Sequence, residues 1–267
     1  MLNHPFCQKL ANNIKNKNTY VCVGLDPDLD KIPDFLPKNI KSLETFLTEI
    51  IEQTQEHCIA YKPNISFFEA LGIEGLQLLE KIRKRIPAHI PVILDAKRGD
   101  IGNTSKMQAK FIFDYFGADA TTLHPYMGID SLEPFFNYKD KFNFILALTS
   151  NPSAKDFEKQ LMNNKKPLYE FVTKNCSDWN KKYQNIGLVV GATQDELQEI
   201  RKIDTALPFL IPGVGAQGGD YETAVNNGTN EDGIVIINMS RGILYCSNDK
   251  GFGKIVNAKI RSLKCLK

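Results

Sequence analysis

The chain has 267 residues, of which 42% are hydrophobic and 24% are charged, so it has ample material for a folded core. Its formal net charge of +2 is too small to indicate a nucleic-acid-binding or membrane-surface protein. No apolar run approaches the roughly 20 residues of a membrane-spanning helix, and residues 1–17 lack the apolar centre of a signal peptide. We therefore expect a cytoplasmic protein with neither a nucleic-acid nor a membrane partner.

Eight short apolar segments alternate with segments of helical periodicity along the chain. The predicted strands cover residues 20–25, 59–62, 90–95, 120–123, 144–149, 186–191, 209–214 and 233–238. The predicted helices cover residues 1–17, 41–58, 66–71, 73–85, 104–116, 130–136, 167–183, 193–202, 220–227 and 253–266. No linker or change of composition divides residues 1–267. Strict alternation at this length predicts an α/β fold with one domain, a (β/α)8 TIM barrel.

The six cysteines are scattered along the chain. No two of them have the spacing of a redox motif, and no cysteine–histidine spacing suits a zinc site. Several lie within or beside apolar segments, which predicts free, buried thiols in a reducing compartment.

The third predicted strand runs into the segment V-I-L-D-A-K-R-G-D-I-G-N-T, residues 92–104. Side chains on a strand alternate with a period of two, so Asp95 and Lys97 are expected on the same side. A carboxylate and an ammonium group on a buried strand are costly unless they pair or take part in chemistry. A purely structural ion pair at the end of the strand is the alternative interpretation.

Charged side chains also follow the first two predicted strands. Asp26 comes directly after the first, and Lys62 ends the second. In barrel enzymes the active site lies at the carboxyl ends of the strands. Neighbouring strands would therefore bring Asp26 and Lys62 close to Asp95 and Lys97, which predicts a charged site at this end of the barrel.

The last two strands are followed by a second group of candidate residues. Residues 212–220, P-G-V-G-A-Q-G-G-D, contain four glycines that let backbone N–H groups approach an anion, and Arg241 follows the eighth strand. Barrels often bind phosphate at this place, which favours a phosphate site over a plain turn beside a surface arginine. The segment also matches the dinucleotide pattern G-x-G-x-x-G. That pattern follows the first strand of its fold, so its position here argues against a dinucleotide site.

These segments together resemble the orotidine 5′-phosphate decarboxylase family. Residues 95–100, D-A-K-R-G-D, are similar to its D-x-K-x-x-D signature, which sugar-phosphate decarboxylases and aldol-type synthases share. Further matches follow in the order of the family, and the full set is more specific than the signature. They are G-L-D-P-D (24–28), Y-K-P-N (61–64), P-Y-M-G (125–128), G-V-G-A-Q-G-G-D (213–220) and S-R-G (240–242). The K-P-N form resembles a bacterial-type branch.

The resemblance implies a reaction and a role for each matching residue. Orotidine 5′-phosphate would be converted to UMP and CO2 in de novo pyrimidine biosynthesis, with no cofactor and no metal. Lys97 would protonate a carbanion at C6, Asp95 would lie against the substrate carboxylate, and Lys62 and Asp100 would complete an alternating charge network. The implied substrate-binding residues are Asp26, Ile101, Thr104, Ser150, Pro212, Gly215, Gln217 and Arg241.

The resemblance also implies a homodimer with shared active sites. In the family, the aspartate at the position of Asp100 reaches into the site of the partner subunit, together with the positions of Ile101 and Thr104. The polar segment 151–166 follows the fifth strand, and we expect part of it to close over a bound nucleotide.

Three alternative functions stay open at this point. A metal-dependent sugar-phosphate decarboxylase or synthase would share the barrel, but its second strand ends in an acidic residue where this chain has Lys62. A Schiff-base aldolase would need a neutral lysine, which Asp95 and Asp100 disfavour. A non-catalytic sensor of a phosphorylated ligand would bind nucleotide without turnover.

Overall fold

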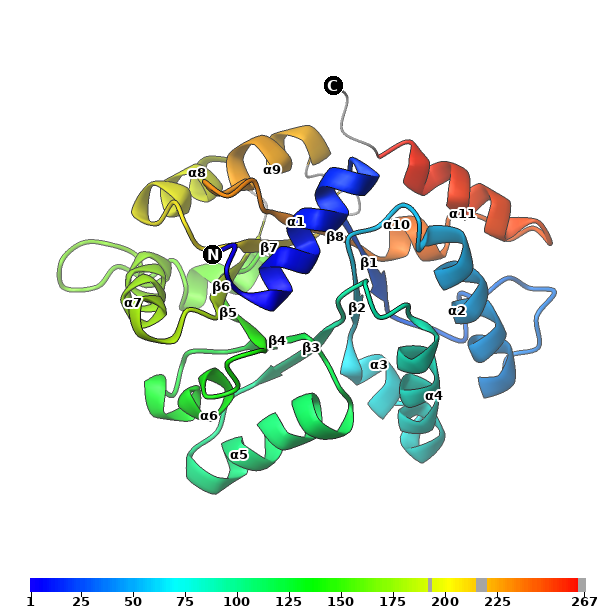
Figure 1. The fold of residues 1–267 in the computed structure, drawn as a ribbon, viewed down its shortest axis with the longest axis horizontal. Coiled ribbons are helices and arrows are strands. Elements are labelled where there is room, and N and C mark those ends of the chain that lie inside the picture. Colours follow the sequence, from blue (N-terminus) through cyan, green and yellow to red (C-terminus); the bar gives the residue numbers. More distant parts are fainter. Residues whose placement is uncertain (192–193, 215–219, 264–267) are drawn as a thin grey trace.

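Eight parallel strands form the centre of the molecule in a computed structural model that describes residues 1–191, 194–214 and 220–263. Their order is β2-β1-β8-β7-β6-β5-β4-β3 (Figure 1), and bridges from Tyr61 to Val92 and from Asn64 to Asp95 join the two outer strands into a ring. The predicted (β/α)8 barrel is therefore confirmed. The strands are β1 (Val21–Leu25), β2 (Ala60–Pro63), β3 (Ile93–Arg98), β4 (Ala120–Leu123), β5 (Phe142–Leu148), β6 (Ile186–Val190), β7 (Phe209–Pro212) and β8 (Ile236–Met239).

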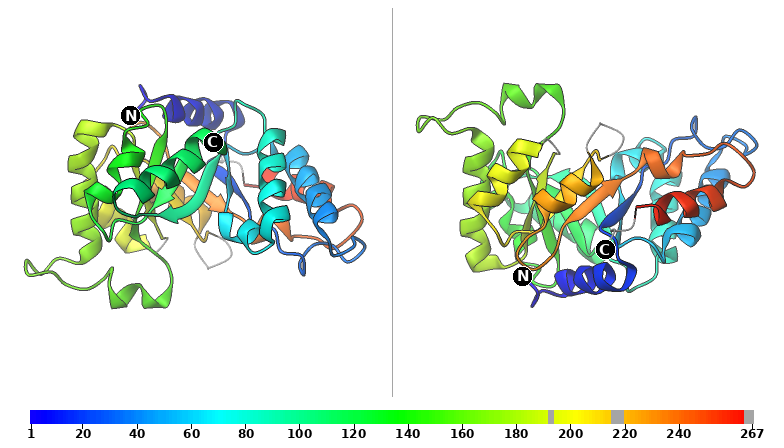
Figure 2. Two further views of the ribbon diagram at one scale, coloured as in Figure 1. Left: turned by 90° about the horizontal axis from the view of Figure 1, so that it is seen from below. Right: turned by 90° about the horizontal axis from the view of Figure 1, so that it is seen from above.

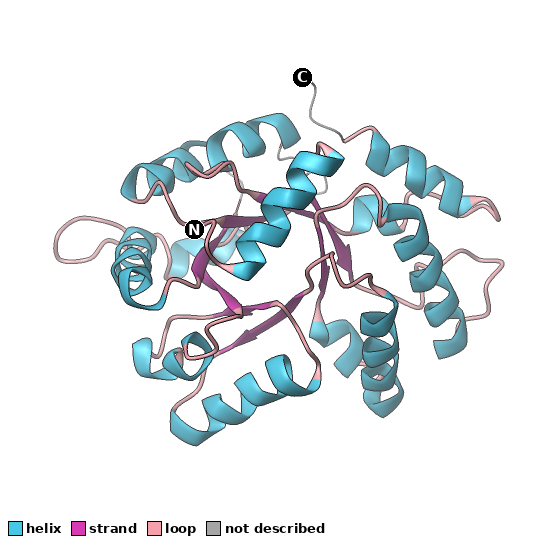
Figure 3. Cartoon of the chain, in the orientation of Figure 1, coloured by secondary structure: helices cyan, strands magenta, loops and turns pink. Residues whose placement is uncertain are grey.

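Helices surround this ring (Figure 3). Each long helix buries one apolar stripe against the strands, as α2 does with Phe46, Leu47 and Ile50. The helices are α1 (Pro5–Lys17), α2 (Ile40–Thr54), α3 (Ile65–Glu69), α4 (Gly72–Arg85), α5 (Gly102–Lys110), α6 (Glu133–Phe136), α7 (Leu168–Tyr183), α8 (Gln194–Ile203), α9 (Tyr221–Gly228), α10 (Arg241–Leu244) and α11 (Phe252–Arg261).

Some element bounds differ from the sequence prediction. The helix expected over residues 104–116 is divided, because α5 ends at Lys110 and a π-helical turn continues over Phe111–Tyr115. The third strand continues to Arg98 instead of ending at residue 95, so Lys97 belongs to the strand. Segment 151–166 is not wholly irregular, since it contains a 3-10 turn over Pro152–Asp156.

Helix α1 closes the amino end of the barrel. Phe6 stacks on the inward-facing Phe142, with ring centroids 5.0 Å apart, and meets Phe144 edge-on at 5.9 Å. Leu10 is fully buried in the same cluster. Figure 2 shows α1 at one end of the barrel and segment 151–166 at the opposite end. The strands therefore present an open mouth only at their carboxyl ends.

The described residues include no helix that is long and apolar enough to cross a membrane. Cys7, Cys22, Cys58 and Cys176 are buried and Cys246 is half-buried, and all five are free thiols. This agrees with the prediction for these positions, and the sixth cysteine lies outside the described residues.

Candidate active site

Three charged side chains meet at the carboxyl ends of β2 and β3. Lys62 Nζ lies 2.6 Å from Asp95 Oδ2, and Lys97 Nζ lies 2.6 Å from Asp95 Oδ1. Lys62 and Asp95 are almost fully buried, whereas the side chain of Lys97 is 49% exposed and reaches the mouth. Because Asn64 pairs with Asp95 across β2 and β3, the strand register sets this arrangement. We call Lys62, Asp95 and Lys97 the charged triad.

The triad holds its central carboxylate ionised. Burial alone would raise the pKa of Asp95, but the positive charges of Lys62 and Lys97 outweigh it and hold that pKa well below the usual range. Burial likewise acts to lower the pKa of Lys62, and the negative charges of Asp95 and Asp26 outweigh this and raise it. A negative charge thus sits between two ammonium groups at neutral pH.

Lys97 has an unusual backbone conformation. Its φ angle is +44°, in the left-handed region, which costs a residue with a side chain on the order of 1–2 kcal/mol. The pairing of β3 with β4 shifts register between Leu94 and Arg98, which is where this residue lies. Period-two alternation predicted that Lys97 and Asp95 share a side, and their ion pair agrees with that. The alternation could not predict the strained backbone.

A group of unpartnered buried oxygen atoms lies at the exits of β1 and β8. Within the described residues, Asp26 Oδ1, Asn238 Oδ1 and Ser240 Oγ are buried and have no hydrogen-bond partner. Gly24 allows these strands to approach, because a Cβ atom there would lie only 2.7 Å from Ser240 Cβ. Buried polar atoms are normally paired, so these oxygens suit a ligand rich in hydroxyl groups. The sequence prediction included Asp26 but missed Asn238.

Three of the remaining predicted residues lie just after β3, in the loop and at the start of α5. Asp100 is half-buried, and its carboxylate accepts a hydrogen bond of 2.8 Å from the Ile101 N–H, while the ion pairs of the described residues include none to Asp100. Ile101 and Thr104 are exposed. Of the other predicted residues, those that the structure describes lie at or just after the ends of strands. Ser150 follows β5, Pro212 ends β7, Arg241 begins α10, and Gly215 and Gln217 lie outside the described residues.

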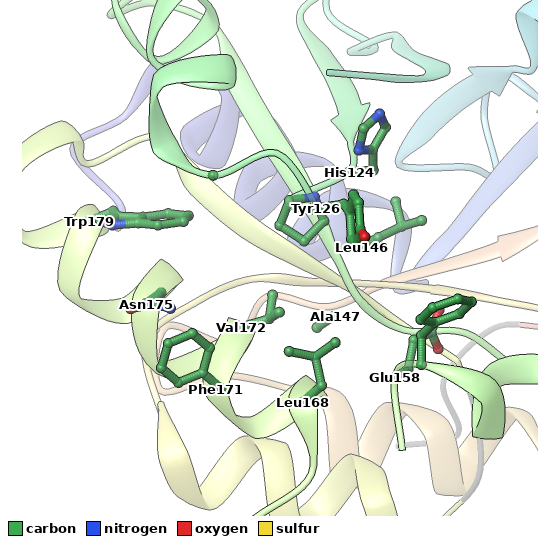
Figure 4. Close-up of a pocket in the computed structure, with 13 residues that line it drawn as sticks. His124, Tyr126, Leu146, Ala147, Glu158, Leu168, Phe171, Val172, Asn175 and Trp179 are labelled. Atoms are coloured by element: carbon green, nitrogen blue, oxygen red, sulfur yellow. The ribbon is translucent and has the colours of Figure 1, made fainter. Parts of the chain in front are cut away.

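A cavity of about 680 Å³ lies between β5, the loop after β4 and α7 (Figure 4). Leu168, Val172 and Trp179 of α7 line one side of it, and His124 and Tyr126 lie across from them. Its lining is mostly apolar and includes no member of the charged triad. We therefore assign the chemistry to the triad and not to this cavity.

Fold and site together define a (β/α)8-barrel enzyme whose reactive charges gather at the carboxyl ends of its strands. Residues 19–251 match the family described as "Orotidine 5′-phosphate decarboxylase / HUMPS family". The chain belongs to this family.

Individual relatives support the same placement. An orotidine 5′-phosphate decarboxylase of Dehalococcoides mccartyi is 48% identical over 254 residues, which is 93% of this chain and 92% of the relative. One of Christiangramia forsetii is 44% identical and covers 96% and 95% of the two chains. The solved structure of Leishmania donovani OMP decarboxylase superposes with a TM-score of 0.84 at 35% identity, covering 98% of this chain and all of that one. The resemblance drawn from the motifs, and the expectation of a carboxy-lyase, are confirmed.

Proposed function

We propose that the protein converts orotidine 5′-phosphate to UMP and CO2, a step of de novo pyrimidine biosynthesis, with Lys97 as the proton donor. The charged triad is the observation that carries this proposal, because it holds a cationic lysine beside a buried carboxylate at the barrel mouth. The printed names of the relatives support the same reaction.

The chemistry follows from the charges. The bond from C6 of the pyrimidine to its carboxylate breaks, CO2 leaves, and the electron pair stays on C6. Lys97 then transfers a proton to C6 and becomes neutral until solvent protonates it again. Asp95 would lie near the substrate carboxylate, so that loss of CO2 relieves the repulsion between two negative charges.

Proton donation alone is too small an effect for this reaction. A general acid typically raises a rate by about 10²–10⁴-fold, which corresponds to roughly 3–5 kcal/mol of barrier. Enzymes as a class lower barriers by roughly 8–23 kcal/mol. Binding energy from the remote phosphate must therefore be used in the transition state. We assign the phosphate to Gly215, Gln217 and Arg241.

The ribose and the base would occupy the space between the triad and the phosphate site. Asp26 would accept hydrogen bonds from the ribose hydroxyls, which agrees with its unpartnered buried oxygen atom. Ser150 would contact the base, with Pro212 nearby, because Ser150 follows β5 and Pro212 ends β7, and both strands are separated from β2 and β3 by other strands of the ring.

We further propose a homodimer in which Asp100, Ile101 and Thr104 complete the site of the partner subunit. Exposed apolar side chains on α5 and in the segments after β3 and β4 support this proposal, because a subunit interface would cover them. These side chains are Ile101, Met107, Tyr126, Met127 and Ile129.

The reaction is proposed to need no metal and no cofactor. In this chain the two oxygen atoms of Asp95 accept hydrogen bonds from Lys62, Lys97 and Thr122, so the two lysines compensate the charge of the carboxylate and no metal ion is needed for that. A metal-dependent sugar-phosphate decarboxylase or synthase of the same barrel group predicts the opposite behaviour. Loss of activity after EDTA treatment would favour that alternative.

The decisive experiment follows the orotidylate absorbance after addition of the protein. We expect it to fall with the wild-type chain and to stay constant with Lys97→Ala, because the variant lacks the proton donor. A wild-type protein that binds UMP but leaves the absorbance unchanged would overturn the proposed reaction in favour of a non-catalytic sensor.

Shared sites are tested by mixing two inactive variants, Asp100→Ala and Lys97→Ala. In a mixed dimer, one of the two sites receives its lysine and its aspartate from chains that retain them. Random exchange of subunits should therefore restore up to about a quarter of wild-type activity. Dimers that exchange subunits but recover no activity would contradict the shared site.

A further inference from the structure

We propose that Thr122, on β4, is a positioning residue that holds Asp95 and the strained backbone of Lys97 in their reactive arrangement. The proposal rests on the proposed decarboxylase function and adds a residue outside the triad. Thr122 is 1% exposed and lies on the inner face of the barrel, next to β3.

One hydroxyl group makes three hydrogen bonds at this place. Thr122 Oγ1 donates to Asp95 Oδ1 over 2.8 Å. The same oxygen accepts the backbone N–H of Ala96 at 3.1 Å and that of Lys97 at 3.0 Å. A threonine hydroxyl has one donor and two acceptor sites, so these bonds use its full capacity.

The strand pairing explains why the backbone needs this side chain. The register of β3 against β4 shifts between Leu94 and Arg98, which interrupts the regular ladder around Ala96 and Lys97. A buried N–H group without a partner is costly, and the Thr122 hydroxyl accepts the two N–H groups in that interruption. It therefore helps to hold Lys97 at its left-handed φ of +44°.

The bond to Asp95 has a second effect. Lys97 Nζ and Thr122 Oγ1 both contact Oδ1, while Lys62 contacts Oδ2, so the rotation of the carboxylate is fixed from both sides. The hydroxyl thus links the side chain of Asp95 to the backbone of Lys97. Loss of the hydroxyl should loosen both reactive groups together.

The preceding residue offers a matched control. Thr121 is also fully buried on β4, but its hydroxyl donates to the backbone oxygen of Leu94 over 2.9 Å. It has no hydrogen bond to Asp95 or Lys97 within the described part of the chain. Replacing either threonine with valine removes one hydroxyl group from the same strand at nearly constant volume.

The experiment compares Thr122→Val, Thr122→Ser and Thr121→Val with the wild-type protein. We expect Thr122→Val to lower kcat for orotidine 5′-phosphate by about 10–100-fold, since a bond to a charged group and two backbone bonds are lost. KM and the Kd for UMP should change by less than about threefold, because the nucleotide is held elsewhere. Thr122→Ser should restore most of kcat, and Thr121→Val should retain it even if it melts at a lower temperature.

A second readout is independent of turnover. In crystal structures of the free variants, Lys97 should leave the left-handed region in Thr122→Val and keep it in Thr121→Val. If Thr122→Val folds and keeps wild-type kcat and the left-handed Lys97, the proposed role is wrong. If the wild-type chain itself does not turn over the substrate, the proposed reaction fails, and the Lys97 conformation in the variants still decides the role of Thr122.

Discussion

At the scale of single residues, the site depends on a carboxylate that is buried between two ammonium groups. Taking charges out of water is costly, and the cost is met here by short contacts from Asp95 to Lys62, Lys97 and Thr122. The arrangement keeps Lys97 close to a fixed negative charge. The proposed proton donor is therefore already in place at the barrel mouth before any substrate binds.

Replacing Lys62 with methionine tests how much the triad contributes to the fold. Asp95 would lose one of its two counter-charges in a buried place, so we expect unfolding free energy to fall by about 3 kcal/mol. Lys81→Met is the control, because Lys81 is 57% exposed and its ion pair with Glu44 should contribute less than about 1 kcal/mol to the unfolding free energy. Urea denaturation measures both, and equal losses in the two variants would contradict the expectation.

The depressed pKa of Asp95 predicts a pH dependence of stability. In the unfolded chain this carboxyl titrates near its usual value of 3.8, and in the folded chain it titrates well below that. Between these two values the unfolded chain binds more protons, so stability falls as the pH is lowered through this window. The contribution of Asp95 is fully present above about pH 5.

Urea denaturation of the wild type and Asp95→Asn between pH 5 and pH 3 measures this dependence. The wild type should lose stability more steeply than the variant, which lacks the carboxyl group. Parallel curves would show that Asp95 titrates alike in the folded and unfolded chains.

The sequence predicted much of the site at this scale, for a definite reason. Alternation along strands placed Asp95 and Lys97 on one side, and barrel topology brought Lys62 to them, as their ion pairs confirm. The sequence did not indicate a role for Thr122, because threonine is common on strands and its contacts depend on the register of the neighbouring strand. The φ of Lys97 could not be foreseen, since nothing in its residue type favours the left-handed region.

At the scale of elements, segment 151–166 is tied to the end of β5. Glu158 accepts hydrogen bonds from the Thr149 N–H over 2.7 Å and from the Thr149 hydroxyl, next to Ser150. Lys159 forms an ion pair with Glu196 of α8. The sequence predicted a polar loop here, but the 3-10 turn and these long-range contacts depend on the tertiary structure.

We expect this segment to become more protected when nucleotide binds. Closure would exclude water and strengthen the charge contacts inside the site. Amide hydrogen exchange of residues 151–166 should slow in the presence of UMP, while exchange in α1, at the other end of the barrel, serves as the internal control. Unchanged exchange in the segment at saturating UMP would argue against closure.

At the scale of the whole molecule, one barrel core carries the site. Apolar side chains fill the inside of the ring, and a second, larger cluster lies between the strands and the surrounding helices. The alternation of apolar runs with helical periodicity predicted this architecture well, because strands buried on both faces are continuously apolar and helices repeat every 3.6 residues. The packing of α1 across the amino end was not predicted, since a short amphipathic helix can cover many surfaces.

The buried thiols give a test of the integrity of this core. Burial raises the pKa of Cys58 to about 11 and that of Cys7 to about 12, so both are protonated at neutral pH and shielded from reagents. We expect a thiol reagent to leave Cys7, Cys22 and Cys58 unmodified in the native protein and to label them in urea. Mass spectrometry of the labelled peptides measures this, with the half-buried Cys246 as the more reactive comparison. Rapid native labelling of Cys22 would mean that the barrel opens.

The packing of Phe6 and Leu10 of α1 across the amino end of the barrel has a consequence for substrate entry and product release. With the amino end closed by α1, the described part of the barrel opens to solvent at its carboxyl end. Substrate would therefore enter, and both products would leave, at that end. If the proposed reaction holds, carbon dioxide, the smaller product, would leave past the bound nucleotide, whereas UMP would be retained until its phosphate is released. The closed amino end thus predicts, for the proposed reaction, an ordered release with carbon dioxide first and the nucleotide last.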